Sequence, residues 1–90
     1  MAASPKLVLD GEAVEALLSL PPAARRRVLQ VLDQLRHDPP RMTEDFAETD
    51  PSGRHISVKG IRPVLIRYWL DGPVEEFRVT RLTIVKPWRE

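Results

Sequence analysis

Two proline pairs, Pro21-Pro22 and Pro39-Pro40, limit the helices that this chain can form. Proline has no backbone N–H and its ring clashes with the preceding helical turn, so a helix tolerates it only in its first turn. One helix must therefore end before Pro21. A second can begin at Pro22, and it must end before Pro39. The first half of the chain can hold two short consecutive helices and no long one.

Apolar periodicity predicts both helices, over residues 12–20 and 22–37. Asp10 is a suitable N-cap for the first, and Pro22 suits the first position of the second. The apolar stripes are Ala13, Ala16, Leu17 and Leu20 in the first helix and Ala24, Val28, Val31, Leu32 and Leu35 in the second. Two such helices form an α-hairpin whose apolar faces need a sheet or each other.

Strand patterns fill most of the remaining chain. Residues 61–70 are rich in β-branched and aromatic side chains, and in residues 55–59 the apolar Ile56 and Val58 alternate with polar residues. We expect the apolar faces of these two strands to cover the helices. Tyr68 has the same parity as Val64 and Ile66, which predicts a place in the core. The predicted strands span residues 6–9, 55–59, 61–70 and 74–85.

Local signals predict the connections. Residues 38–53 contain prolines and few large apolar groups, which favours a loop that ends in a type I turn at Asp50–Gly53. Asp71-Gly72 is typical of a tight type I′ hairpin turn. In the last strand the apolar residues change face part-way, which a bulge near Arg81 would reconcile.

These elements predict an α+β protein with the order β-α-α-β-β-β. The α-hairpin packs on one face of a mainly antiparallel four-stranded sheet, and the other face is partly polar. Ninety residues suit one domain over 1–90, with residues 1–5 and 87–90 as tails.

Composition narrows the class of protein. The chain is 42% hydrophobic and 30% charged, as in an ordinary globular domain, and it has no cysteine, which excludes disulfides and thiolate chemistry. No apolar run approaches the roughly 20 residues that span a bilayer, and the N-terminus lacks the features of a signal peptide. We therefore expect a cytoplasmic protein without a membrane partner.

The charges are unevenly divided along the chain. Residues 1–53 contain six Lys or Arg against nine Asp or Glu, whereas residues 54–90 contain eight against four. A basic second half is compatible with a phosphate-rich partner, although a difference of this size also arises by chance in small domains.

Several stretches together resemble the RelE/ParE family of toxins from bacterial type II toxin–antitoxin modules. They cover residues 6–86 in order: LLSLPPAARRRVLQVLDQLRHDPP, the pair Asp45-Phe46, the Gly53-Arg54 pair, GIRPVLIRYW and FRVTRL. The resemblance implies a four- or five-stranded sheet with two helices on one side. It also implies a partner antitoxin that forms a hetero-oligomer with the toxin and holds its activity in check.

The family contains two activities, and the fold does not separate them. RelE-like members cut messenger RNA in the ribosomal decoding site, whereas ParE-like members poison DNA gyrase. Metal-independent RNA cleavage needs a proton acceptor for the 2′-OH, a proton donor for the leaving oxygen and positive charge for the phosphorane. The resemblance implies that Arg62 and Lys59 stabilise phosphate. His55 is a candidate proton carrier because its ordinary pKa lies near neutrality.

Further basic and aromatic residues complete the predicted nucleic-acid site. Each has a simpler interpretation as part of a solvated sheet face. The family's C-terminal tyrosine has no tyrosine counterpart here; Trp88 could stack on a base but cannot supply a phenol. The histidine or arginine pair that commonly follows the last strand is also missing. The candidate nucleic-acid contacts are Arg54, Arg67, Arg81, Lys86 and Trp88.

Other sites find little support in the sequence. The two histidines, His37 and His55, do not have the spacing of metal ligands, and there is no glycine-rich phosphate loop, so we expect no metal and no cofactor. Arg25–Arg27 spread around a helix, which favours a solvated helix over a dock for ribosomal RNA or an acidic antitoxin segment.

Three functions stay open at this point. The first is a toxin that cuts ribosome-bound messenger RNA as a metal-independent endoribonuclease. The second is a gyrase inhibitor that is not an enzyme, and the third is a non-toxic relative that serves as a binding module. An adjacent gene for a small antitoxin would strengthen both toxin interpretations.

Overall fold

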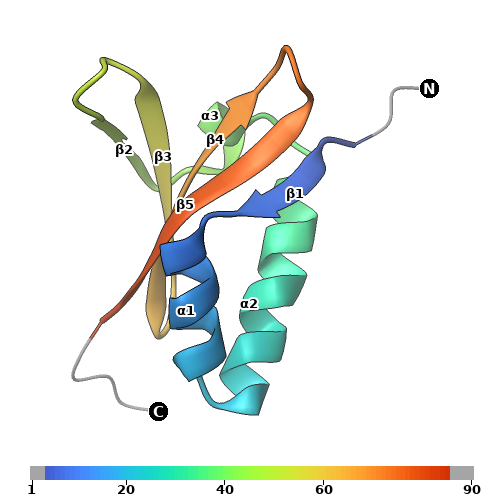
Figure 1. Ribbon diagram of the computed structural model, residues 1–90, viewed down its shortest axis with the longest axis vertical. Helices are drawn as coiled ribbons and strands as arrows, with labels where there is room; N and C mark the ends of the chain where they lie inside the picture. Colours follow the sequence, from blue (N-terminus) through green and yellow to red (C-terminus); the bar gives the residue numbers. More distant parts are fainter. Residues whose placement is uncertain (1–3, 86–90) are drawn as a thin grey trace.

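A computed structural model describes residues 4–85, and it shows a twisted sheet with two helices against one of its faces (Figure 1). This confirms the α+β class and the α-hairpin on the sheet. β1 pairs parallel with β5, and the other neighbours are antiparallel. The sheet has five strands in the order β1-β5-β4-β3-β2: β1 (Lys6–Leu9), β2 (Phe46–Thr49), β3 (His55–Ile61), β4 (Val64–Asp71) and β5 (Glu76–Ile84).

The two predicted helices are confirmed as α1 (Gly11–Ser19) and α2 (Pro22–Leu35). Asp10 occupies the N-cap position in an extended conformation, but its side chain makes no capping hydrogen bond. Arg25 of α2 closes the other end of α1: its Nη2 donates to the carbonyl oxygens of Leu18 and Leu20, both at 3.1 Å. These bonds satisfy carbonyls that the end of a helix leaves without partners.

The core lies between the helices and one face of the sheet, which we call the helix face. α2 contributes Val28 and Leu32, both fully buried, and the predicted core residue Tyr68 stacks on Phe77 with ring centroids 5.1 Å apart. Burial raises the pKa of the Tyr68 phenol, whose oxygen is 2.7 Å from Thr43 Oγ1. Within residues 4–85, no helix is long and apolar enough to cross a membrane.

The prediction of a loop over residues 38–53 is wrong in two places. This segment contains the short helix α3 (Pro40–Thr43) and the edge strand β2. α3 begins at a proline, which is well tolerated at a first helical position. All four residues of β2 are exposed, so no apolar alternation marks the strand; its pairing with β3 alone defines it. The expected four-stranded sheet therefore has a fifth strand.

The expectation that Ile56 and Val58 cover the helices is also wrong. Residues that face each other across antiparallel strands share a face of the sheet, and Ser57 pairs with Tyr68 while Val58 pairs with Arg67. Ser57 therefore lies on the helix face, and Ile56 and Val58 lie on the opposite face, which we call the open face. Both of these apolar residues are buried there, under neighbouring side chains of the sheet.

The connections follow the predictions in part. Asp50–Gly53 forms a turn in which the Gly53 N–H donates to the Asp50 carbonyl at 2.9 Å, and Gly53 has a φ of 87°. The prediction of a tight type I′ turn at Asp71-Gly72 is wrong. β4 ends at Asp71, β5 begins at Glu76, and four residues connect them.

The predicted bulge is confirmed at Thr80, next to Arg81. Arg67 pairs with Arg81 and Tyr68 pairs with Val79, so Thr80 is the extra residue between them. The bulge lets all the large apolar residues of β5 face the helices.

Candidate functional site

The predicted site residues lie in three places. Arg54, Arg67 and Arg81 lie on the open face, and His55 and Lys59 lie on the helix face of β3. Arg62 lies in the β3–β4 turn. Lys86 and Trp88 are outside the described residues.

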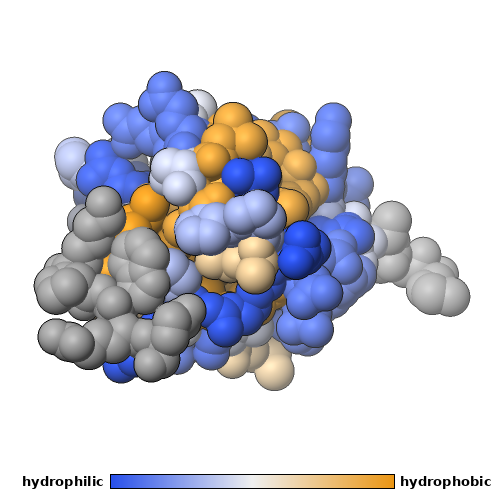
Figure 2. Space-filling model, turned by 90° about the horizontal axis from the view of Figure 1, so that it is seen from below, coloured by the Kyte–Doolittle hydropathy of each residue, from blue (hydrophilic) through white to orange (hydrophobic). Residues whose placement is uncertain are grey.

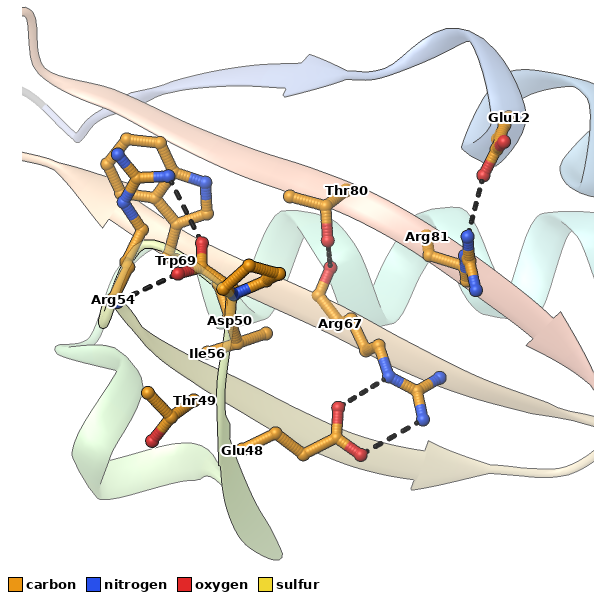
Figure 3. A pocket seen from close by; sticks show the side chains of 11 residues that line it. Glu12, Glu48, Thr49, Asp50, Arg54, Ile56, Arg67, Trp69, Thr80 and Arg81 are labelled. Carbon is orange, nitrogen blue, oxygen red and sulfur yellow. Dashed lines mark hydrogen bonds and ion pairs between the residues drawn. The ribbon is translucent and has the colours of Figure 1, made fainter.

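A pocket of about 410 Å³ on the open face brings the three arginines together with carboxylates (Figure 3). The Arg67 guanidinium meets the Glu48 carboxylate at two points, Nε to Oε1 at 2.8 Å and Nη2 to Oε2 at 3.2 Å, and Nη1 donates to Thr83 Oγ1 at 2.8 Å. The hydrogen bond from Arg67 holds the pKa of Glu48 below its ordinary value. Arg81 forms an exposed ion pair with Glu12 at 3.2 Å.

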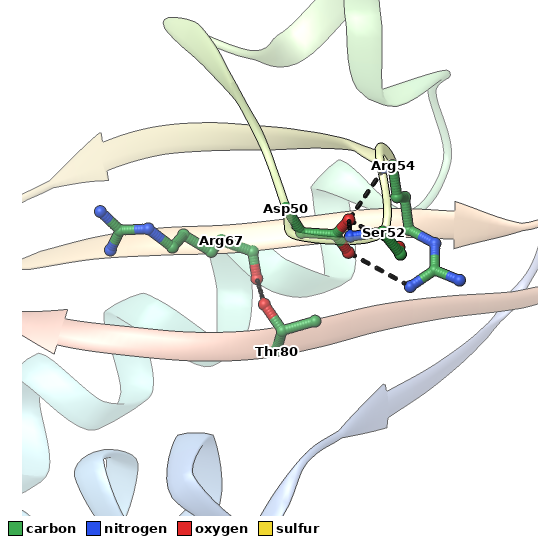
Figure 4. A network of polar contacts seen from close by, with 5 residues as sticks. All are labelled: Asp50, Ser52, Arg54, Arg67 and Thr80. Carbon is green, nitrogen blue, oxygen red and sulfur yellow. Dashed lines mark hydrogen bonds and ion pairs between the residues drawn. The ribbon is translucent and has the colours of Figure 1, made fainter.

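Arg54 is placed by the turn that precedes it (Figure 4). Asp50 Oδ1 accepts hydrogen bonds from the Ser52 hydroxyl and from the Arg54 backbone N–H, at 2.7 and 2.8 Å, and these contacts lower the pKa of Asp50. The Arg54 guanidinium lies 3.9 Å above the centre of the Trp69 ring and 3.4 Å from Asp50. A cation over an indole ring is held by the quadrupole of the ring.

His55 pairs with the carboxylate of Glu44 on the helix face. Its Nε2 is 2.7 Å from Glu44 Oε1, and the same oxygen accepts from the Ser57 hydroxyl at 2.7 Å. These hydrogen bonds, the one from His55 first, hold the pKa of Glu44 below its ordinary value of 4.5. The imidazole is therefore oriented by a carboxylate, an arrangement that fixes which ring nitrogen carries the proton.

Lys59 lies two residues further along the same face, 3.3 Å from Asp45 Oδ1. Asp45 Oδ2 also accepts from the Gly60 N–H at 2.8 Å, and this backbone bond is the main reason why the pKa of Asp45 is lowered. Together with the Glu44 contacts, these bonds attach the segment between α3 and β2 to β3.

Arg62 is exposed in the β3–β4 turn, where its carbonyl oxygen accepts a 2.8 Å hydrogen bond from Arg27 Nη2. β3 runs from His55 to Ile61, and Arg62 follows it directly. At about 3.3 Å per residue, the predicted catalytic residues His55 and Arg62 therefore lie roughly 20 Å apart along the strand. The structure brings His55 and Lys59 to one face but places Arg62 at the other end of that strand.

Sequence reasoning missed the acidic partners Glu44, Asp45 and Glu48, because they lie in the segment predicted to be a loop. Glu44 and Asp45 precede β2, and Glu48 on β2 reaches across β3 to Arg67 on β4, so no charge pattern between neighbouring strands marks these pairs. They become recognisable only once β2 is known to pair with β3.

No family model matches the sequence, and no curated protein matches it either. Among solved structures, one similar chain belongs to the crystal structure of the archaeal RelE–RelB complex from Pyrococcus horikoshii OT3. The two share 20% sequence identity with a TM-score of 0.73, and the match covers 96% of this chain and 100% of the other. The chain has a RelE-type fold. The resemblance seen in the sequence is therefore confirmed at the level of the fold.

The RelE-type fold here presents cationic groups that are already paired with carboxylates. Among residues 4–85 there is no cluster of three or more His, Cys, Asp or Glu side chains that could hold a metal ion. The groups present can bind an anion and can exchange a proton at an imidazole. Both properties are useful for contact with a phosphodiester.

Proposed function

We propose that this protein is the toxin subunit of a type II toxin–antitoxin module. The observation that carries the proposal is the fold, because a chain from a RelE–RelB complex matches nearly the whole of this one. An antitoxin is the partner that follows from this proposal.

Exposed apolar residues supply a surface that an antitoxin could cover. Val14 and Leu18 lie one helical turn apart on α1, and Leu18 is 62% exposed; Leu29 of α2 is 40% exposed. Figure 2 shows hydrophobic side chains gathered in the middle and upper part of the view from below, with hydrophilic ones on both sides of them. Contiguous exposed apolar surface commonly marks a protein interaction site.

The chemistry that we propose is cleavage of ribosome-bound messenger RNA without a metal ion. Arg54, Arg67 and Arg81 offer guanidinium groups to phosphates on the open face. The carboxylates that pair with these arginines are open to solvent, and solvent weakens such ion pairs, so a phosphate can replace a carboxylate. His55 supplies a group that can exchange a proton near neutral pH, while Lys59 and Arg62 add positive charge along β3.

The separation of His55 from Arg62 favours a second candidate, a gyrase inhibitor that works by binding protein. An inhibitor needs a surface and no catalytic constellation, and the ion-paired open face would suit a partner protein of mixed charge. A non-toxic binding module is the third candidate.

Induction of the gene in growing cells separates the three candidates. Rapid loss of messenger RNA with cuts at a fixed phase of the codon supports the endonuclease. Double-strand DNA breaks with intact messenger RNA identify the gyrase inhibitor, and undisturbed growth identifies the binding module. Coexpression of the neighbouring antitoxin gene should suppress either toxicity, which controls for damage from overexpression alone.

A further inference from the structure

The sheet ends in two edge strands, β1 on one side and β2 on the other (Figure 1). An edge strand presents backbone N–H and C=O groups that have no partner strand, and proteins commonly protect such edges with charged side chains. β2 is protected in this way, because it contains Glu48 and lies between Asp45 and Asp50. β1 has the sequence Lys-Leu-Val-Leu, and its three apolar residues are only half-buried. The edge at β1 is therefore the one that is open to another strand.

The hydrogen bonds to β5 show which backbone groups of β1 point outward. The N–H of Lys6 donates to the Glu75 carbonyl at 2.9 Å, and the N–H of Asp10 donates to a carbonyl of β5 at 3.0 Å. Successive residues of a strand direct their N–H and C=O groups to opposite sides in the plane of the sheet. Leu7 and Leu9 therefore direct theirs away from β5, toward the open edge.

The sequence of β1 is complementary to itself in one antiparallel register. If Leu7 pairs with Leu9 of a second copy, a two-fold axis pairs Leu9 with Leu7 of that copy, and the outward N–H and C=O groups of both residues bond across the edge. This register is centred on Val8, which lies opposite Val8 of the second copy. It also places Lys6 opposite Asp10 of the second copy on both sides of the axis.

The charges at the two ends of this register are available for pairing. Lys6 is exposed, and it takes part in no ion pair with another residue of the range 4–85. The Asp10 carboxylate lies 3.7 Å from Arg78, whose closer partner is Glu76 at 2.6 Å. Opposite charges that face each other across two strands stabilise the pairing. Each copy would thus supply one unpaired cation and one weakly held anion to the other.

The edge at β2 gives the opposite result. The Asp50 N–H donates to the Arg54 carbonyl at 3.0 Å, so the same alternation directs the backbone groups of Ala47 and Thr49 outward. Pairing of these two residues across a two-fold axis would bring Glu48 against Glu48 of the second copy. Like charges directly opposite each other are destabilising. The charge pattern therefore favours association of two copies through β1 and opposes it through β2.

We propose that two copies of this chain pair through β1, antiparallel and centred on Val8, so that their two five-stranded sheets become one continuous sheet. Both α-hairpins then lie on the same side, because residues that face each other across antiparallel strands share a face. The open-face pocket is left outside the contact, since no residue of β1 lines it. The proposal concerns the sheet edge and does not depend on the proposed function.

Hydrogen exchange of the whole protein, measured by NMR from micromolar to millimolar concentration, tests this contact directly. We expect protection of the Leu7 and Leu9 amides to rise with protein concentration, because these N–H groups become bonded only in the dimer. Ala47 and Thr49 are internal controls on the other edge, and their amides should exchange at the same rate throughout. Sedimentation velocity on the same samples should show the change from monomer to dimer.

Two charge variants give a sharper test. Lys6→Asp and Asp10→Lys each place like charges opposite each other in a homodimer, so each variant alone should dimerise about tenfold or more weakly. A mixture of the two variants restores opposite charges at both positions, and it should form a heterodimer as readily as the unmodified protein forms its dimer. Arg26→Asp reverses one exposed charge on α2 and is the matched control that should leave dimerisation unchanged.

The proposal is overturned if the unmodified protein stays monomeric at millimolar concentration, or if a dimer forms while the Leu7 and Leu9 amides stay unprotected. It is also overturned if the mixed charge variants associate no better than either variant alone. Protection of Leu7 and Leu9 that appears only after a different protein is added would assign the edge to that protein and reject self-pairing. Since the exchange experiment uses the unmodified chain, it tests the proposal even where a charge variant does not fold.

Discussion

At the scale of single residues, Arg62 is the predicted phosphate-binding group whose position differs most from that of the others. It is exposed in the β3–β4 turn, and its contact with Arg27 uses the backbone carbonyl, which alanine retains. A long RNA strand on β3 could still reach both this arginine and His55.

Arg62→Ala should reduce RNA cutting by about a hundredfold or more, the effect of removing one donor that stabilises a transition-state oxyanion. The melting temperature should stay that of the unmodified protein, since the change is at an exposed turn. Arg26→Ala is the control for loss of one surface charge. Cutting that persists in Arg62→Ala would show that this arginine is not part of the site.

The Glu48–Arg67 pair offers a second test at this scale. Glu48→Gln removes the carboxylate that holds Arg67, so the guanidinium becomes available to a phosphate. Because solvent weakens this pair, the gain should be modest, and affinity for a short single-stranded RNA should rise by up to about fivefold. Arg67→Ala should lower it. Fluorescence anisotropy at a fixed salt concentration measures both, and weaker binding by Glu48→Gln would exclude the open face as the RNA surface.

At the scale of elements, Arg25 joins the two helices by donating to the end of α1. Arg25→Ala leaves these carbonyls without their donor, and we expect a loss of about 1–2 kcal/mol in the free energy of unfolding, measured by urea denaturation. Arg26→Ala, one residue further on, should change it by less than about 0.5 kcal/mol. Equal stability of the two variants would show that solvent replaces the Arg25 contacts without cost.

The segment from α3 to β2 is attached to β3 through carboxylates. Glu44 and Asp45 both have a pKa below the ordinary value, 4.5 for Glu and 3.8 for Asp, so protons bind the folded state less readily than the unfolded state. Their stabilising contribution is complete above these ordinary values and is lost as the pH falls through the lowered pKa values.

Amide protection in β2 should therefore fall ahead of that in β4 and β5 when the pH is lowered through this range. Hydrogen exchange, corrected for the intrinsic rate at each pH, measures the difference. Simultaneous loss of protection in all three strands would contradict a separate acid-sensitive attachment.

The elements differ in how far the sequence determines them. Proline positions and apolar periodicity predicted α1 and α2 because both signals are local. The edge strand β2 was missed because its exposed residues carry no alternation, so only its partner defines it. Ile56 and Val58 show a third limit: alternation separates the two sides of a strand but does not say which side meets the helices. Both residues are buried on the open face, where none of the helices in residues 4–85 lies.

At the scale of the whole molecule, the uneven charge of the chain is largely used within the fold. Acidic residues of the first half pair with basic residues of the second: Glu12 with Arg81, Glu48 with Arg67 and Asp45 with Lys59. The count of charges was compatible with a phosphate-rich partner, whereas in the fold acidic side chains of the first half lie against basic side chains of the second. The candidate residues were recognisable from their chemistry, but their separation into two faces and a turn depends on strand register.

The most direct test of the central claim uses the purified protein, programmed ribosomes and a defined messenger RNA, with cleavage mapped by primer extension. The account predicts cuts at a fixed phase of the codon in the ribosomal decoding site, none in the same RNA without ribosomes, and none after addition of the antitoxin. Intact messenger RNA on the ribosome, together with inhibition of purified DNA gyrase by the same preparation, would contradict it.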